Sequence, residues 1–290
     1  MFFTNPELYD YDLWQRMEQW FAQEIDLIMS GEKHLSYSAL SKFCESPLHF
    51  KRYKINKKFF PEDQDTKAME EGKIFHMCLL EPEKFMKKYM WMDDSDIVEK
   101  LRKEGSKSPR STKKYKEEVA KFLEARPGME VLKKEDWQTY MAMSYAANKH
   151  IEAGPILKAM DSKESKFEYE HNGFKLLGFY DGEGSNYNGA PFTGDAKKIA
   201  SLVPKKLKWE IYDRRYHLQG GLYSLARNSR QHFLIFVDKS INVQVVQLEN
   251  ETLDDGIHLL ETTLQNFEDC AAESRWNEGY EYYNGGLVKI

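Results

Sequence analysis

The first half of the chain carries apolar residues every three or four positions, which is the spacing of amphipathic helices. Leu13, Met17, Phe21 and Ile25, for example, fall on one side of a helical turn pattern near the N-terminus. This periodicity predicts helices over residues 9–31, 66–81, 112–126 and 134–152. Within residues 35–54 it predicts a short helix that Ser36 or Ser38 would cap and that ends near Pro47.

From residue 165 onward, apolar residues alternate with polar ones, which is the pattern of β-strands. Asn172-Gly173, between the first two segments of this kind, is a strong signal for a hairpin turn. The alternation predicts strands over residues 165–171, 174–181, 190–197, 232–239 and 242–248. Helical spacing returns over residues 204–228 and in a closing helix over residues 253–276.

This order of elements favours an α/β fold in one domain. Helices come first, followed by three strands, a helix, two strands and a final helix, with no long linker and no internal repeat. We therefore expect one mixed β-sheet flanked by helices on both faces.

Composition and charge exclude several classes of protein. Hydrophobic residues make up 41% of the 290 and charged residues 31%, and no apolar run approaches the length that spans a bilayer, so no membrane partner is expected. The first residues lack a basic segment followed by an apolar one, which argues against a secretory signal, and a cytoplasmic location is expected. The net charge of −5 argues against a surface coated in positive charge, but it is compatible with a local basic channel for nucleic acid.

The three cysteines are Cys44, Cys78 and Cys270, and no two of them form a CxxC pair. Their wide spacing argues against a zinc ribbon and against an iron–sulfur cluster. It also favours a reducing compartment.

Candidate chemistry gathers at the ends of the second and third predicted strands. Asp181 closes one strand, and Thr193, Asp195 and Lys197 face one way on the next, because side chains alternate along a strand. Two carboxylates that meet there, with the carbonyl of Ala196, would form a site for a hard cation such as Mg²⁺. Lys197 would hold a water, help to deprotonate it and stabilise charge on a phosphate, as phosphodiester hydrolysis requires.

Simpler interpretations stand beside this one. An Asp-x-Lys triplet occurs by chance in many soluble proteins, and the alternative is a turn with solvated charges. His76 lies amid apolar residues on a predicted helix, where a histidine is more often a hydrogen-bonded core residue than a ligand. Whether His76 can act as a ligand depends on whether that helix lies over the strand ends.

Two stretches are rich in basic residues. Residues 197–215 hold seven against two acidic ones, directly after the proposed site, and residues 102–116 hold seven against one. A phosphate backbone needs such charge, although a solvated helix face is the simpler interpretation for most of the lysines. A polar stripe beside the site is expected from Arg214, Arg215, Gln219 and Tyr223.

Four segments resemble phage and prophage 5′→3′ exonucleases of the RecE (exonuclease VIII) type, within the PD-(D/E)xK nucleases. Residues 72–85, GKIFHMCLLEPEKF, resemble the Gly-x-x-Phe-His helix of that family and the Leu-Glu-Pro-Glu-x-Phe that follows it. GFYDG and TGDAKK stand where the first metal aspartate and the Asp-x-Lys strand belong, and YDRRYHLQGGLYSL resembles the helix with a Gln-x-x-x-Tyr motif. The resemblance spans roughly residues 35–280 and implies a restriction-endonuclease-like core.

The resemblance also implies a role for each matching residue. The metal ligands would be His76, Asp181, Asp195 and the carbonyl of Ala196. Lys197 would be the catalytic lysine, Gln219 and Tyr223 would support the site or touch the DNA end, and Glu164 matches an acidic position in related nucleases. DNA contacts are expected from Arg110, Lys113, Lys114, Lys198, Arg214 and Arg215.

Residues 1–34 have no counterpart in the resemblance. They would form an N-terminal helical extension that covers the core or mediates assembly, ahead of an exonuclease domain over residues 35–290.

The function that the resemblance implies is a Mg²⁺-dependent exodeoxyribonuclease with a two-metal site, in which Mn²⁺ can substitute. It would degrade one strand of linear double-stranded DNA 5′→3′ from the ends and leave a 3′ overhang for a single-strand-annealing protein, working as a homo-oligomer. Two alternatives stay open: an endonuclease or a nuclease for single strands or RNA, and a catalytically silent DNA-binding or assembly protein of the same fold.

Overall fold

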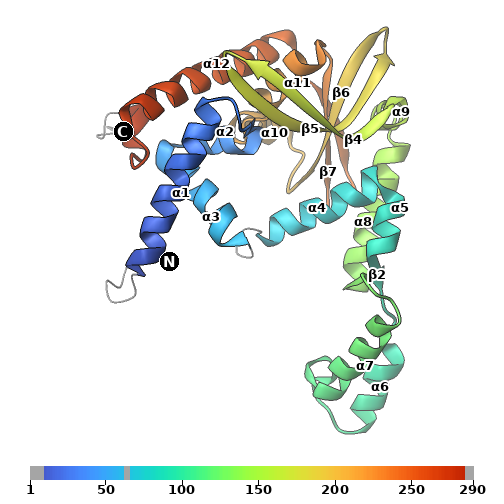
Figure 1. The fold of residues 1–290 in the computed structure, drawn as a ribbon. Helices are drawn as coiled ribbons and strands as arrows, with labels where there is room; N and C mark the ends of the chain where they lie inside the picture. The colour runs from blue at the N-terminus through green and yellow to red at the C-terminus, as the bar shows by residue number, and fades with distance from the viewer. Residues whose placement is uncertain (1–9, 62–65, 285–290) are drawn as a thin grey trace.

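The computed structural model describes residues 10–61 and 66–284, which fold around a six-stranded sheet (Figure 1). The strand order is β1–β5–β6–β7–β8, and β4 also pairs with β5. β1 with β5 and β6 with β7 run parallel, whereas the other pairs are antiparallel, so the predicted mixed sheet is confirmed. The strands are β1 (Leu35–Ser36), β4 (Ser162–His171), β5 (Phe174–Tyr187), β6 (Ala190–Ile199), β7 (His232–Asp238) and β8 (Val243–Gln247).

Most of the helices precede β4 in the chain, as the periodicity predicts. They are α1 (Tyr11–Met29), α2 (Tyr37–Phe43), α3 (Pro47–Phe59), α4 (Lys67–Leu80), α5 (Pro82–Lys88), α6 (Ser95–Lys103), α7 (Lys113–Glu124), α8 (Lys134–Lys149) and α9 (Ala153–Ala159). The later ones are α10 (Pro204–Asp213), α11 (Tyr216–Arg227), α12 (Asn250–Glu273) and α13 (Glu281–Asn284).

Local chemistry sets several element boundaries. Asn172 and Gly173 both have positive φ, 49° and 79°, as a tight hairpin turn requires, and they join β4 to β5. The short helix predicted to begin at Ser36 or Ser38 and to end near Pro47 is α2, and Ser36 caps it. A second helix, α3, begins at Pro47, because Ser46 caps α3 and proline is accepted in a first turn. The helix predicted over residues 204–228 is in fact two, because Arg215 adopts a left-handed conformation between α10 and α11.

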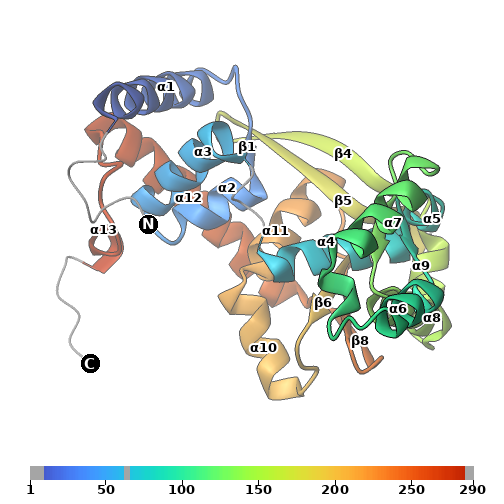
Figure 2. The same ribbon diagram turned by 90° about the horizontal axis from the view of Figure 1, so that it is seen from below.

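Helices cover both faces of the sheet, which confirms the predicted layers (Figure 2). Every residue of β7 is buried. Phe233, Ile235 and Val237 pack with α4, α5, α8 and α9, whereas Leu234 and Phe236 pack with α10 and the start of α12. A strand with two covered faces carries a continuous apolar run, as residues 233–237 of β7 show.

The N-terminal helix α1 packs on the core. Phe21, Ile25 and Ile28 are buried in a cluster with α2, α3, α11 and α12. Lys51 of α3 is almost fully buried, and its ammonium lies 2.7 Å from Glu18 of α1. The assignment of residues 1–34 as a separate extension, which covers the core or mediates assembly, stays a prediction, and residues 1–9 lie outside the described residues.

Helices α6 and α7 form a pair that projects away from the sheet (Figure 1). The short parallel strands β2 (Tyr89–Trp91) and β3 (Glu130–Leu132) lead out to it, and the 3₁₀ turn η3 (Pro109–Ser111) joins its two helices. No helix in residues 10–61 and 66–284 is long and apolar enough to cross a membrane.

Candidate active site

The candidate site lies where α4 passes over β4 and β5. The imidazole of His76 reaches both strands: Nε2 is 2.7 Å from Oδ2 of Asp181, and Nδ1 is 3.0 Å from Oε1 of Glu164. Phe75 and Leu79 of the same helix are buried in the core, which fixes the helix with His76 over the sheet. The sequence left open whether this helix lies over the predicted strand ends. It lies over the sheet at Glu164 and Asp181, but the prediction that Asp181 ends its strand is wrong, because β5 continues to Tyr187.

Glu164 faces Asp181 across the two antiparallel strands. The pairs on either side, Lys163 with Gly182 and Ser165 with Tyr180, place these two acids opposite each other. Glu164 has a φ of 54°, a left-handed conformation that a residue other than glycine rarely adopts in a strand. Such strain is retained where the surrounding structure holds it, often at functional sites.

Asp195 and Lys197 lie beside this group on β6. Asp195 is fully buried, and Nζ of Lys197 lies 2.6 Å from its Oδ2. The amide of Gln219 donates hydrogen bonds to Oδ1 of Asp195 (2.9 Å) and to the Tyr223 hydroxyl (2.8 Å), and that hydroxyl donates to the carbonyl of Phe179 (2.6 Å). Gln219 and Tyr223 of α11 thus fix the orientation of Asp195.

The backbone joins the two acidic groups. The Ala196 N–H donates a hydrogen bond to Oδ2 of Asp181 at 2.8 Å. The structure therefore brings His76, Asp181, Asp195 and Lys197 together, as the sequence predicts, and it places Glu164, the acidic position matched through the resemblance, beside them.

Comparison with known families identifies the superfamily. Residues 34–276 match the family model of the PD-(D/E)XK nuclease superfamily, which covers most of the chain. The chain belongs to the PD-(D/E)XK nuclease superfamily. No curated protein matches the sequence.

A solved structure shares the fold of this nuclease. A "putative exonuclease" from Eubacterium rectale is 15% identical, with a TM-score of 0.55, and the alignment covers 99% of this chain and 95% of that one. At this identity the similarity shows the fold. The structure of SSO0001 is also 15% identical and covers 67% of this chain and 84% of that one, but its TM-score of 0.29 is too low to support an argument.

The charges in the nuclease site perturb one another. Burial and the charge of Asp181 raise the pKa of Asp195. Burial alone would lower the pKa of Lys197, but the charges of Asp195 and Asp181 outweigh it and raise that pKa, so the ammonium stays protonated. Burial lowers the pKa of His76, but the hydrogen bond to Asp181 and the nearby negative charges raise it by more. Burial raises the pKa of Asp181, but the hydrogen bond to His76 and the nearby positive charges lower it by more.

The residues fit a divalent metal ion, the cofactor that nucleases of this superfamily generally use. One ligand atom each from His76, Glu164 and Asp181 lies within 4.8 Å of the others. Oε1 of Glu164 and Oδ2 of Asp195 are buried and find no hydrogen bond of good geometry in the described chain, although each has a cationic or histidine nitrogen close by. Burying a carboxylate oxygen without a well-formed hydrogen bond costs free energy. A hard cation bound to these oxygens would offset that cost.

Metal binding by the individual residues stays a prediction, and so does the role of the Ala196 carbonyl. Glu164, Asp181 and Asp195 would supply the oxygen atoms, and His76 would supply a nitrogen. Mg²⁺ prefers oxygen ligands, whereas a histidine nitrogen also suits softer divalent ions.

The predicted DNA contacts lie in two places. Arg110, Lys113 and Lys114 belong to the projecting α6–α7 pair, where each has an acidic partner: Asp94, Glu117 and Glu104, respectively. Lys198 lies at the end of β6 with its ammonium 2.9 Å from Glu71 of α4. Arg214 pairs with Glu210 at 2.9 Å, and Arg215 lies 3.9 Å from Glu45. Their contact with DNA stays a prediction.

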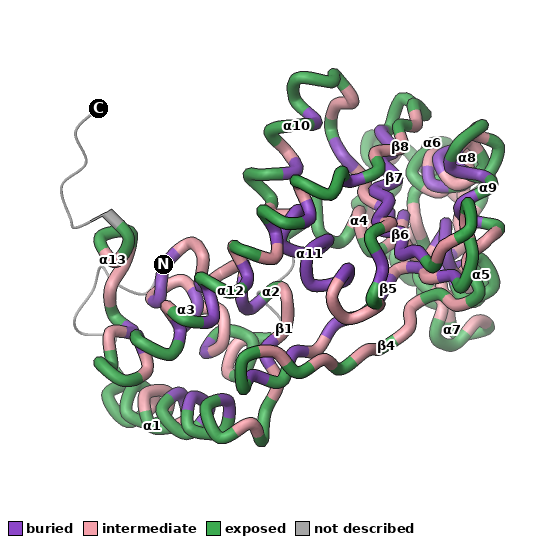
Figure 3. The backbone as a smooth tube through the Cα atoms, turned by 90° about the horizontal axis from the view of Figure 1, so that it is seen from above, coloured by how far each residue is buried: buried purple, intermediate pink, exposed green. Residues whose placement is uncertain are grey.

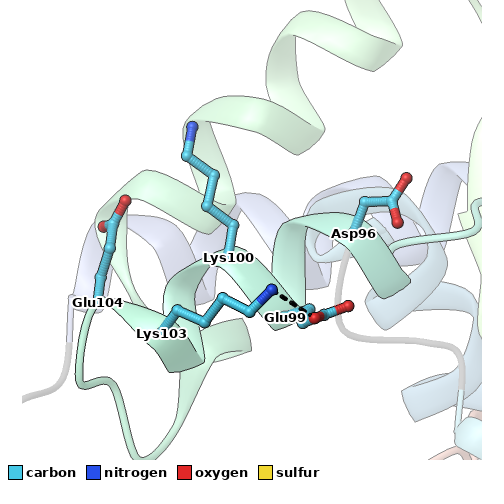
Figure 4. Close-up of a pocket in the computed structure, with 5 residues that line it drawn as sticks. All are labelled: Asp96, Glu99, Lys100, Lys103 and Glu104. Atoms are coloured by element: carbon cyan, nitrogen blue, oxygen red, sulfur yellow. Dashed lines mark ion pairs between the residues drawn. The ribbon is translucent and has the colours of Figure 1, made fainter.

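One surface hollow lies away from this chemistry. It has a volume of about 440 Å³ and is lined on α6 by Asp96, Glu99, Lys100, Lys103 and Glu104 (Figure 4). These side chains are solvated, and Lys103 pairs with Glu99 at 2.6 Å. It lies on the projecting pair, far from the sheet, and it supplies none of the groups that catalysis needs.

Sequence reasoning missed one aromatic neighbour of the site. The ring of Tyr216, the first residue of α11, lies 5.1 Å from Nζ of Lys197. Its position depends on the break between α10 and α11, which the helical periodicity does not reveal. Tyr216 and His217, which precede the Gln-x-x-x-Tyr motif in the segment that carries the resemblance, were the sequence signal that could have identified this neighbour.

Proposed function

We propose that this nuclease is a Mg²⁺-dependent 5′→3′ exodeoxyribonuclease of the RecE type, acting on the ends of linear double-stranded DNA. The observation that carries the proposal is the convergence of His76, Glu164, Asp181, Asp195 and Lys197 at one point. The motifs that resemble RecE-type enzymes supply all of these residues except Glu164, which matches an acidic position in related nucleases. The similar fold over the whole chain belongs to a protein described as a "putative exonuclease".

Each group has a task in phosphodiester hydrolysis. The three carboxylates and His76 would hold the metal ion, which when bound polarises the phosphate and lowers the pKa of a coordinated water. Lys197 is protonated beside Asp195, so it stabilises negative charge that develops on the phosphate. Gln219 and Tyr223 keep Asp195 in position without changing its charge.

The biological setting follows from the resemblance. Degradation of one strand would leave a 3′ overhang for a single-strand-annealing protein, and a closed homo-oligomer would keep the enzyme on its DNA. An endonuclease with the same site is the competing function, since the carboxylates and the lysine serve either mode of cleavage.

A digestion assay tests the proposal. Linear duplexes labelled at the 5′ or the 3′ end are incubated with Mg²⁺, beside a closed circular duplex, an EDTA control and the variants Lys197→Ala and Lys149→Ala. We expect early release of the 5′ label as mononucleotides, intact circles, no activity for Lys197→Ala and full activity for Lys149→Ala, which changes an exposed lysine of α8.

Other results would redirect the assignment. Cut circles would favour the endonuclease. Cleavage that survives Lys197→Ala would remove the site from the reaction. An absence of cleavage with both Mg²⁺ and Mn²⁺ would leave a binding or assembly protein of this fold.

A further inference from the structure

Helix α10 presents an unpaired basic and aromatic face next to the active site. Leu207 and Ile211 bury one side of the helix against Ile199, the last residue of β6. Trp209 lies on the opposite side and is 63% exposed. Figure 3 shows α10 as a largely exposed helix at the rim of the molecule.

The exposed face of α10 has a net positive charge, since three lysines outnumber the exposed Asp213 at the end of the helix. Lys205, Lys206 and Lys208 are exposed, and none has an ion-pair partner within the described residues. This contrasts with Lys113 and Lys114 of α7, whose ammonium groups lie 3.7 Å and 2.7 Å from glutamates. Unpaired lysines on a chain with a net charge of −5 mark a local site for an anion.

The chain connects this face directly to the catalytic residues. It leaves the site after Lys197, forms α10, and returns at Tyr216, whose ring lies 5.1 Å from the Lys197 ammonium. Helix α10 therefore lies in the segment between Lys197 and Tyr216, two residues that are in contact. A strand held on α10 would lie beside the cleavage site.

The spacing along α10 suits a single strand of nucleic acid. Lys205, Trp209 and Tyr212 follow one another at four and three positions, so they line one face of the helix. A positive groove with an exposed aromatic ring is what proteins use to hold single strands, since bases stack on the ring and phosphates meet the lysines.

We infer that α10 binds a single strand of DNA, with a base stacked on Trp209 and its phosphates on Lys205, Lys206 and Lys208. The inference rests on the proposed function for the source of that strand, which is the one that cleavage leaves or consumes. The occupant is nucleic acid because the face combines unpaired positive charge with an exposed indole. A purely apolar partner would leave three ammonium groups unpaired.

Binding in EDTA tests the inference without cleavage. Fluorescence anisotropy measures the Kd of a labelled single-stranded oligonucleotide, a blunt duplex and a duplex with a 3′ tail. The variants are Trp209→Ala, Lys205→Ala/Lys206→Ala/Lys208→Ala, and the control Tyr145→Ala/Lys149→Ala. The control removes an exposed aromatic–lysine pair of the same spacing from α8, with Tyr145 66% exposed.

We expect Trp209→Ala to raise the Kd for the single strand and the tailed duplex about tenfold, within the range of one lost base stack. The triple lysine variant should reduce the slope of log K against log salt by about 2, since each phosphate contact to a single strand adds about 0.7. Trp209→Phe should restore most of the affinity, and the α8 control should bind like the wild type. Thermal unfolding confirms that each variant is folded.

Every outcome decides between the two proposals. Wild-type binding that neither α10 variant weakens would overturn the inference and leave the nuclease assignment intact. Weakened binding by the variants, with no cleavage by the wild type in Mg²⁺ or Mn²⁺, would support the α10 site and reject the exonuclease. Loss of an oligomer in Trp209→Ala with unchanged Kd would make α10 an interface between copies, against the inference. No binding to any DNA would overturn both.

Discussion

Glu164 and Asp181 face each other across β4 and β5, and His76 of α4 inserts its ring between them. The arrangement brings two acids together, which would repel each other as paired carboxylates. Burial raises the pKa of Glu164, and the charge of Asp181 adds to this, whereas that of His76 opposes it. His76 therefore compensates for the acids in this structure, and a metal ion would do the same.

Glu164→Gln tests whether this acid binds metal. The change keeps the shape of the side chain but removes the charge, so we expect the Mg²⁺ concentration for half-maximal cleavage to rise about tenfold or more. The control is Glu168→Gln on the same strand, where the acid is exposed and pairs with Lys166 at 2.6 Å. Equal Mg²⁺ requirements for the two variants would show that Glu164 is not a ligand.

We expect Asp195 to make the metal-free protein less stable as the pH rises. Burial and the charge of Asp181 raise its pKa to about 7 in the folded state, above its ordinary value near 4. The folded state then holds a proton that the unfolded state releases, so stability is lost as the pH rises through this window, by at most about 4 kcal/mol.

Asp195→Asn removes this loss. In EDTA, its melting temperature relative to the wild type should be higher at pH 8 than at pH 4.5. Added Mg²⁺ should then stabilise the wild type more than the variant, because a ligand stabilises the state that binds it. A difference in melting temperature that stays constant with pH would mean that Asp195 keeps an ordinary pKa.

Lys198 anchors α4 to the sheet. Its ammonium and that of Lys239 both lie 2.9 Å from one carboxylate oxygen of Glu71, and together their hydrogen bonds lower the pKa of Glu71 to about 2. We therefore expect Lys198→Ala to lower stability by about 1 kcal/mol while leaving the salt dependence of DNA binding unchanged. Lys206→Ala on α10 should instead leave stability unchanged and flatten the salt dependence of DNA binding. A flatter salt slope for Lys198→Ala would assign this lysine to DNA.

The sequence predicts the parts of the site that follow from regular elements. Asp195 and Lys197 share a face because strand side chains alternate, and the apolar positions around His76 identify its helix. Glu164 could not be placed in this way, because its left-handed backbone breaks the alternation on which the prediction rests. The sequence indicated its importance only through resemblance.

Charges were harder to interpret than hydrophobic patterns. Lys114 meets Glu104 and Arg110 meets Asp94 only because α6 folds back on α7, and no predicted helix covered α6. The sequence therefore shows a basic stretch where the fold presents ion pairs. On α10, by contrast, the lysines that the sequence analysis interpreted as a solvated helix face are exposed and have no ion-pair partner within the described residues.

The packing of α12 on α11 gives the last prediction. Gly256 lies where the two helices cross, and a Cβ there would collide with the carbonyl of His217. A Cβ on Gly221 would lie 2.6 Å from the backbone nitrogen of Ile257. Because α11 also carries Gln219 and Tyr223, any shift of this helix reaches Asp195.

We expect Gly256→Ala to lower the free energy of unfolding by about 1–3 kcal/mol, as overpacking does, and to reduce cleavage in the same variant. Gly72→Ala is the matched control on α4, where a Cβ would meet no atom within 4 Å, so the better helix former should add up to about 1 kcal/mol. Urea unfolding and cleavage rates measure both effects. If Gly256→Ala were as stable and as active as the wild type, the helix crossing could widen without moving Asp195, and α11 would not need close packing to position the site.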